Sequence, residues 1–287
     1  MITTNIYGGL GNQMFQYACG KSLSIKNNTE LGIEKTLFKN YELRDFLLDK
    51  FNTKYKAPNY SKLQRNLISN YYIRAVLFYL NKFKIFQFGL FFEKEDFKYN
   101  KKIESPNIKF IYGYWQSVDY FENIRKELLK DFTLKERLDT INKELMEEIR
   151  SSNSISLHVR RGDYLKMKDS ENGHGLCSLE YYDNAIKYIS KEVLNPHFYV
   201  FSDDIDWVKN SLKIPFPVTF INNNYKNPEK DLILMKNCKH NITANSSFSW
   251  WGSWLNENLN KIVVMPSKWM NNLEIPKGLI YENCKII

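Results

Sequence analysis

The chain has 287 residues, which is more than one compact core usually contains and therefore favours two domains. Hydrophobic residues make up 43% of the chain, aromatic residues 15% and charged residues 25%, and these proportions exclude a disordered protein. The formal net charge is +9, but no recognisable nucleic-acid-binding motif accompanies it. The sequence therefore gives no support to a nucleic-acid partner.

The sequence carries no sign of export or membrane insertion. Residues 1–6 lack the basic patch and apolar stretch of a secretory signal, and no apolar run approaches the roughly 20 residues of a spanning helix. We therefore expect a cytoplasmic protein. The cysteines show neither C-x-x-C nor metal-ligand spacing, which predicts free thiols and no structural zinc. They are Cys19, Cys177, Cys238 and Cys284.

Strands and helices alternate along most of the chain. Residues 2–7 are predicted to form a strand, residues 8–11 a glycine loop, and residues 12–26 a helix. Such alternation predicts parallel sheets with right-handed crossovers. The break between two series falls near residue 150, so we expect domains over 1–150 and 151–287. Further strands are predicted at 109–112, 155–159, 197–202, 218–221, 241–244 and 261–265, and further helices at 120–129, 136–150, 179–190, 205–212, 229–237 and 248–256.

The motif GGLGNQMFQYA at 8–18, which comprises the glycine loop at 8–11 and the start of the predicted helix, follows the first predicted strand. Ligands of open α/β sheets bind beyond the carboxyl ends of the strands, and glycines let backbone amides approach an anion there. Neither a dinucleotide fingerprint nor a P-loop fits, because position 14 is Met14 and no Gly-Lys-Ser/Thr follows. A tight turn before a buried helix explains the loop equally well.

Two adjacent arginines follow the strand at 155–159, in the motif HVRRGDY at 158–164. A guanidinium offers a rigid, permanently charged fork of donors that suits a phosphate or a carboxylate. For Arg160, at the expected ligand edge, we favour this role. For Arg161 we favour an ion pair with Asp163.

A third motif, ANSSFSWWG at 244–252, joins a predicted strand to a helix. Ser246 and Ser247 suit the N-cap of that helix. The start of a helix, with free amides and hydroxyls, is equally a phosphate site. The tryptophans at near-helical spacing favour a core position over a substrate platform. They are Trp250, Trp251 and Trp254.

Together with the strand end Phe201-Ser202-Asp203, these motifs resemble the α-1,2-fucosyltransferases of glycosyltransferase family 11 and occur in the family order. The resemblance implies an α/β, GT-B-like fold, with two Rossmann-like domains facing across a cleft. Residues 1–150 would face the acceptor, and residues 151–287 would bind GDP-fucose. The implied reaction is inverting transfer of L-fucose from GDP-β-L-fucose to the 2-hydroxyl of a terminal galactose in an oligosaccharide, without a metal or other cofactor.

The resemblance also assigns roles to individual residues. Arg160 inherits a contact with the β-phosphate of the donor, and Asn12 faces the departing phosphate from the opposite domain. Asp163 is the first candidate for the general base that deprotonates the acceptor hydroxyl, followed by Glu171 and His174. The expected donor site comprises Gly9, Gly11, Asn12, His158, Arg160, Asp203, Asn245, Ser246, Ser247 and Phe248.

Two other functions compete with this interpretation. Asp204 and Asp206 have the spacing by which metal-dependent GT-A transferases hold manganese, but they open a predicted helix, where acidic residues are also favoured as caps. We favour the cap. A sugar-binding module without catalysis is the other alternative, and it would not need a phosphate clamp.

The segment 54–91 is basic and aromatic, with seven Lys or Arg residues and no acidic residue. One interpretation is a helical arm of the acceptor domain, with buried aromatic rings and solvated lysines. The other is a surface that associates peripherally with anionic lipid of the inner membrane. We favour the first.

Overall fold

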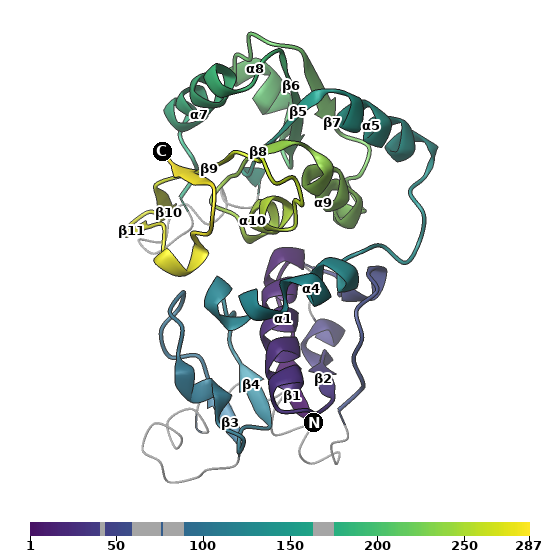
Figure 1. Cartoon of the computed structure of the whole chain (residues 1–287), viewed down its shortest axis with the longest axis vertical. Coiled ribbons are helices and arrows are strands. Elements are labelled where there is room, and N and C mark those ends of the chain that lie inside the picture. The colour runs from purple at the N-terminus through teal and green to yellow at the C-terminus, as the bar shows by residue number, and fades with distance from the viewer. Residues whose placement is uncertain (41–43, 59–75, 77–88, 163–174) are drawn as a thin grey trace. The chain divides into compact units, whose positions relative to one another are not determined.

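The computed structural model describes residues 1–40, 44–58, 76, 89–162 and 175–287. These residues form two compact units, Met1–Thr133 and Leu134–Ile287. Each unit is an α/β structure built around a parallel sheet, so the predicted fold class is confirmed (Figure 1). Most of the basic segment 54–91 lies outside the described residues, and its association with membranes stays a prediction.

The boundary between the units lies earlier than the predicted one at residue 150. Helix α5 (Thr140–Ser151) belongs to the second unit, where it packs on α9 (Pro228–Asn237). Side-chain contacts hold it there. Asn142 donates to Asn224 over 2.9 Å, and Lys230 of α9 pairs with Asp139 at 2.7 Å.

The first unit contains a four-stranded parallel sheet in the order β2-β1-β4-β3. The predicted strands at 2–7 and 109–112 are present, whereas the very short β2 and β3 were not predicted. The strands are β1 (Ile2–Asn5), β2 (Leu31–Glu34), β3 (Leu90–Phe92) and β4 (Phe110–Tyr112). The helices are α1 (Leu10–Lys26), α4 (Arg125–Asp131) and the 3-10 turns η1 (Thr36–Asn40), η2 (Leu48–Lys50), η3 (Lys101–Glu104), η4 (Val118–Tyr120) and η5 (Glu122–Ile124).

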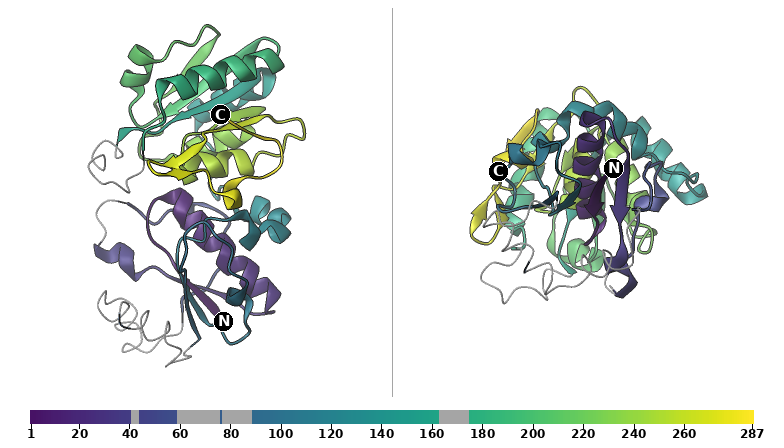
Figure 2. Two further views of the ribbon diagram at one scale, coloured as in Figure 1. Left: turned by 90° about the vertical axis from the view of Figure 1, so that its left-hand side faces the viewer. Right: turned by 90° about the horizontal axis from the view of Figure 1, so that it is seen from below.

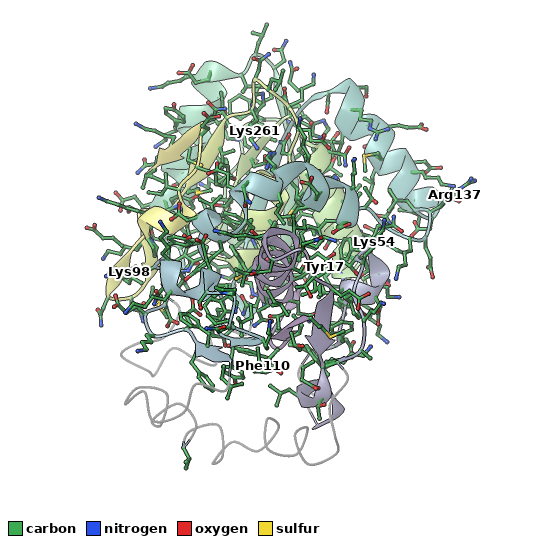
Figure 3. The ribbon with its side chains drawn as sticks, turned by 60° about the horizontal axis from the view of Figure 1, so that its bottom comes forward. Tyr17, Lys54, Lys98, Phe110, Arg137 and Lys261 are labelled. Carbon is green, nitrogen blue, oxygen red and sulfur yellow. The ribbon has the colours of Figure 1, made fainter. Side chains whose placement is uncertain are left out.

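Helix α1 forms the centre of the first unit and is buried over most of its circumference. Its Tyr17, labelled in Figure 3, is fully buried. The Tyr17 hydroxyl donates to Asp131 of α4 over 2.6 Å and accepts the backbone N–H of Lys54 over 3.1 Å. One phenol thus joins α1 to two segments that are distant in the sequence.

The second unit contains a six-stranded parallel sheet in the order β12-β9-β8-β5-β6-β7. All the strands and helices predicted over residues 155–265 are present within a few residues. Its strands are β5 (Asn153–Val159), β6 (Pro196–Ser202), β7 (Val218–Ile221), β8 (His240–Ile242), β9 (Val263–Met265), β12 (Cys284–Ile286) and the antiparallel pair β10 (Lys268–Met270) and β11 (Leu273–Glu274). Its other helices are α7 (Leu179–Glu192), α8 (Ile205–Ser211), α10 (Ser247–Trp254) and η6 (Lys277–Leu279).

Strand β5 shows how this sheet separates its two faces. Ile155, Leu157 and Val159 point to one face, where they join a core cluster with residues of α7 and α8. Helix α7 lies across this face in Figure 2 (left). The alternate residues, including Ser156 and His158, point to the other face, because successive strand side chains alternate. The side chains of Ser156 and His158 therefore lie on the same face of the sheet as α10.

No helix in the described part of the chain is both long and apolar enough to cross a membrane. The four cysteines are free, as predicted.

Candidate functional site

The carboxyl edge of the six-stranded sheet brings two predicted motifs together. Strands β5 and β6 are parallel neighbours, with His158 opposite Phe201 and Val159 opposite Ser202. The same register continued by one residue places Arg160 beside Asp203. The arginine motif and the Phe201-Ser202-Asp203 strand end therefore form one site.

Arg160 and Asp203 form an ion pair, with 3.0 Å between Nη1 and Oδ2 and with 23% and 22% of the side chains exposed. Asp203 Oδ1 also accepts the backbone N–H of Arg161 over 2.8 Å. Partial burial raises the pKa of Asp203, but the Arg160 charge and the backbone hydrogen bonds outweigh it and hold the pKa below its usual value. Asp203 is therefore ionised, and it holds Arg160 and the backbone of Arg161 in place. The sequence analysis missed this role.

Gly162 makes this arrangement sterically feasible. A Cβ atom at this position would lie 3.0 Å from Asp203 Oδ2, closer than most real contacts. A larger residue would therefore press on the carboxylate that holds Arg160.

Arg161 has a different partner. Its Nε lies 3.3 Å from Asp204 Oδ2, and its guanidinium stacks 4.1 Å from the Trp207 ring centroid. Asp204 also accepts the Trp207 N–H at the start of α8, which is the capping role that we favoured. Among the residues that the structure describes, no group of three His, Cys, Asp or Glu side chains is arranged to hold a metal ion. The predicted partner of Arg161, Asp163, lies outside the described residues.

His158 is a buried imidazole at the end of β5, 4% exposed. The centroid of its ring lies 5.6 Å from the ring centroid of Phe248 on α10, so two predicted donor-site residues are in contact. Burial, followed by the nearby charge of Arg160, lowers the pKa of His158 to about 3. His158 is therefore a neutral side chain at physiological pH.

This shift predicts a pH dependence of stability. Below pH 6.5 the unfolded chain binds a proton at His158 that the folded protein does not bind until about pH 3. Within this window the free energy of unfolding should fall, as pH falls, by up to about 1.4 kcal/mol per pH unit on account of this residue. Urea unfolding of the wild type and of His158→Gln between pH 7 and 4 measures the difference. Parallel curves for the two proteins would contradict it.

The motif at 244–252 forms the start of α10. Ser246 is the N-cap and accepts the backbone N–H of Phe248 over 3.4 Å, and Ser247 is the first helical residue. Asn245 is 3% exposed; it donates to the carbonyl oxygens of Gly175 at 2.7 Å and Trp269 at 3.1 Å. It therefore connects the residues before α10 to Gly175 and to strand β10. The capping role of Ser246 is confirmed, whereas contacts of these residues with a ligand stay a prediction.

The three tryptophans of α10 are core residues, as predicted. Trp250 and Trp251 are fully buried and Trp254 is 2% exposed. Trp250 stacks on Trp254 with 5.9 Å between ring centroids, and its indole N–H donates to the carbonyl of Leu279 over 2.7 Å.

The glycine loop lies in the first unit, at the carboxyl end of β1. Gly8 has a φ of +82°, which favours glycine. Helix α1 begins two residues earlier than predicted, so Gly9 is its N-cap and Gly11 lies in its first turn. Asn12 accepts the side-chain N–H of Gln116 over 2.8 Å. Gln116 did not stand out in the sequence, because its contact with Asn12 spans 104 positions.

The predicted residues are thus distributed over three sets. His158, Arg160, Asp203 and residues 245–248 lie at or near the carboxyl edge of the second sheet. Gly9, Gly11 and Asn12 lie in the first unit. The candidates for the general base lie outside the described residues. They are Asp163, Glu171 and His174.

Comparison with known proteins gives consistent results. The model of the family described as "Glycosyl transferase family 11" matches residues 1–277. An Escherichia coli protein, "Alpha-1,2-colitosyltransferase", is 39% identical over 285 residues, which cover 96% of this chain and 94% of that protein. The rabbit (Oryctolagus cuniculus) "Galactoside alpha-(1,2)-fucosyltransferase 2" is 23% identical over 262 residues, which cover 89% of this chain and 67% of the rabbit protein.

A solved structure supports the fold. FUT1 of Arabidopsis thaliana, determined as a variant in complex with GDP, aligns with a TM-score of 0.54 at 9% identity, covering 94% of this chain and 71% of that chain. At this identity the similarity concerns the fold alone, and it agrees with the predicted GT-B-like class.

Proposed function

The chain belongs to glycosyl transferase family 11, and on that premise we propose that it transfers L-fucose from GDP-β-L-fucose to the 2-hydroxyl of a terminal galactose, with inversion at the anomeric carbon. The observation that carries the proposal is the arginine site. A guanidinium fixed by Asp203 lies at the strand edge where α/β proteins bind ligands, next to a neutral imidazole.

The chemistry of the transfer explains why such a site is needed. As the bond from the anomeric carbon to the phosphate breaks, negative charge develops on GDP and positive charge on the fucosyl ring. Arg160 stabilises the developing phosphate charge, and its fixed position avoids reorganisation during the reaction. We propose that this cation serves in place of a metal ion, and that the reaction needs no metal.

The other roles follow the family pattern. Asn12 is proposed to donate an amide hydrogen to the departing phosphate, and Ser246, Ser247 and Phe248 to contact the diphosphate and nucleoside. The acceptor hydroxyl must lose a proton to a base, for which Asp163 stays the first candidate. The acceptor is a galactose-containing oligosaccharide.

The 39% identity to a colitosyltransferase supports a second donor. Colitose is L-fucose without the 3-hydroxyl, so the two donors differ by one polar group at a position remote from the breaking bond. Arg160 and its partners act on the phosphate that the two donors share. Selection between them therefore depends on contacts with the 3-hydroxyl.

A transfer assay tests the proposal. We expect the purified protein, treated with EDTA, to convert GDP-fucose and lactose into a trisaccharide with fucose α-1,2-linked to galactose, identified by mass and linkage analysis. Higher kcat/KM with GDP-colitose would assign the enzyme to the second donor. Activity that disappears with EDTA and returns with manganese would contradict metal independence and would support the alternative, a metal-dependent transferase that uses Asp204 and Asp206.

A further inference from the structure

The turn that follows β4 is held by a carboxylate from the neighbouring strand end. Glu93 follows β3, and its Oε2 accepts the backbone N–H of Tyr114 over 2.5 Å. The N–H of Trp115 lies 3.1 Å from both carboxylate oxygens. Gly113 leaves room for this side chain, because a Cβ there would collide with Cβ of Glu93. One carboxylate therefore binds two consecutive amides of the turn.

The same turn contains an unusual backbone conformation. Trp115 has a φ of +58°, which is uncommon and strained for a bulky residue. Its indole is fully buried and packs against Tyr120 with 5.5 Å between ring centroids. The N–H of Ser117 closes the turn by donating to the Trp115 carbonyl over 2.8 Å. Packing of the indole and the hydrogen bonds that Glu93 accepts thus maintain a conformation that is unfavourable for a tryptophan on its own.

This conformation places the next residue, Gln116, against the glycine loop. Gln116 is 9% exposed, and its Nε2 donates to Asn12 Oδ1 over 2.8 Å. The bond sets the orientation of the Asn12 amide, because it draws the oxygen toward Gln116 and turns the Nδ2 donor away from it. Nδ2 is the atom that could donate to a phosphate.

We propose that Glu93 is a positioning residue for the transfer reaction, which holds the turn 113–117 so that Gln116 orients the amide of Asn12. The proposal rests on the function proposed above, in which Asn12 acts on the departing phosphate. Glu93 itself needs no contact with either substrate.

Glu93 also has a raised pKa, which makes the support of the turn dependent on pH. Burial raises the pKa of Glu93 to about 7, with a further contribution from Asp96, although the bonds from Trp115 and Tyr114 lower it. The negative charge of Glu93 in turn contributes to the raised pKa values of Tyr7, Cys19 and Tyr120, so these neighbours are uncharged near pH 7. Protonation would convert an acceptor oxygen into an O–H group, so the turn should lose part of its support as pH falls through about 7.

The test uses the full-length protein and the side-chain amide resonance of Asn12 in NMR spectra, which reports the orientation without turnover. In Glu93→Gln, an NH2 group replaces one acceptor oxygen. We expect the Asn12 resonance to move toward its position in Gln116→Ala, and to move with an apparent pKa near 7 in the wild type. An unchanged resonance in Glu93→Gln, or in the wild type across this pH range, would overturn the inference whether or not fucose is transferred.

Kinetics provide the second readout. Glu93→Gln should lower kcat roughly 10- to 100-fold and should remove the limb of the kcat–pH profile near 7, with an unchanged Kd for GDP. The double variant with Gln116→Ala should lose little more than either single variant, because both act on Asn12. Multiplicative losses would contradict the proposed route.

A matched control is Glu34→Gln. Glu34, at the end of β2 in the same sheet as β3, is a buried carboxylate, whereas Glu93 is half-buried; Glu34 accepts the N–H of Thr36 over 2.8 Å. This substitution should leave the Asn12 resonance in place. If Glu34→Gln moved the Asn12 resonance as far as Glu93→Gln does, the shift would follow the loss of any carboxylate at a strand end of this sheet. The specific role of Glu93 would then be refuted.

Discussion

Replacement of Arg160 by alanine should lower kcat by about 10²–10³-fold, which corresponds to about 3–4 kcal/mol of lost transition-state stabilisation. The reason is the negative charge that develops on the leaving GDP, which Arg160 is positioned to meet. Lysine should restore only part of the activity, because an ammonium group lacks the planar fork of the guanidinium. Steady-state transfer to lactose, with GDP binding measured separately, checks both expectations.

Two controls separate this effect from damage to the loop. Loss of Arg160 leaves the Asp203 carboxylate without its ion-pair partner, and Asp203→Asn removes that unpaired charge. If activity is lost because the Arg160 cation is missing, and not because Asp203 is unpaired, the double variant Arg160→Ala with Asp203→Asn should be as inactive as Arg160→Ala alone. Arg161→Ala should have a smaller effect, since Arg161 is paired with Asp204 and stacked on Trp207. Equal losses from both arginine substitutions would show that the loop, and not the Arg160 cation, is the sensitive element.

Replacement of Trp250 by alanine should lower the free energy of unfolding by about 3–5 kcal/mol. Trp250 is fully buried, its ring contacts Trp251, Trp254 and Tyr281, and its N–H satisfies the Leu279 carbonyl. The substitution thus removes a large apolar volume and a buried hydrogen bond together. Urea unfolding followed by far-UV circular dichroism measures the loss.

Tyr225→Ala is the comparison for this prediction. Tyr225 belongs to the same unit but is 89% exposed, so its loss should change stability by about 0.5 kcal/mol or less. A Trp250→Ala protein with normal stability and weakened GDP binding would instead identify the indole as a ligand platform and contradict the core assignment.

The sequence allowed much of the second unit to be predicted, because β5 and β6, with seven residues each, and α7, with 14, are long enough to show clear periodicity. The first unit was harder. Its β2 and β3, with four and three residues, were not predicted, whereas the equally short β1 and β4 were. The domain boundary was placed too late because α5 is assigned to its unit by tertiary contacts such as Asn142 with Asn224, which no local pattern contains.

The candidate site shows the same division. The rule that ligands bind at strand ends was enough to single out Arg160 and the glycine loop. The pairing of Arg160 with Asp203 depends on the register between β5 and β6, and that of Glu93 with the turn at 113–117 depends on β3 lying beside β4. Such neighbours are set by the sheet order and are not encoded in residue spacing. Sequence reasoning therefore found Arg160, Asn12 and Asp203, but it missed that Asp203 holds Arg160, and it did not find Glu93 or Gln116.

The ion pair between Arg160 and Asp203 also bears on selectivity among anions. Asp203 is an anion held beside the guanidinium by the chain, so a small anion that approaches Arg160 must compete with a carboxylate at high effective concentration. Chloride or free phosphate brings no other contact to offset that competition. Under the proposed function, a nucleotide diphosphate adds contacts from its base, its ribose and its second phosphate, while Asp203 keeps the guanidinium in place. We therefore expect Arg160 to discriminate against small anions and in favour of a ligand with several points of attachment.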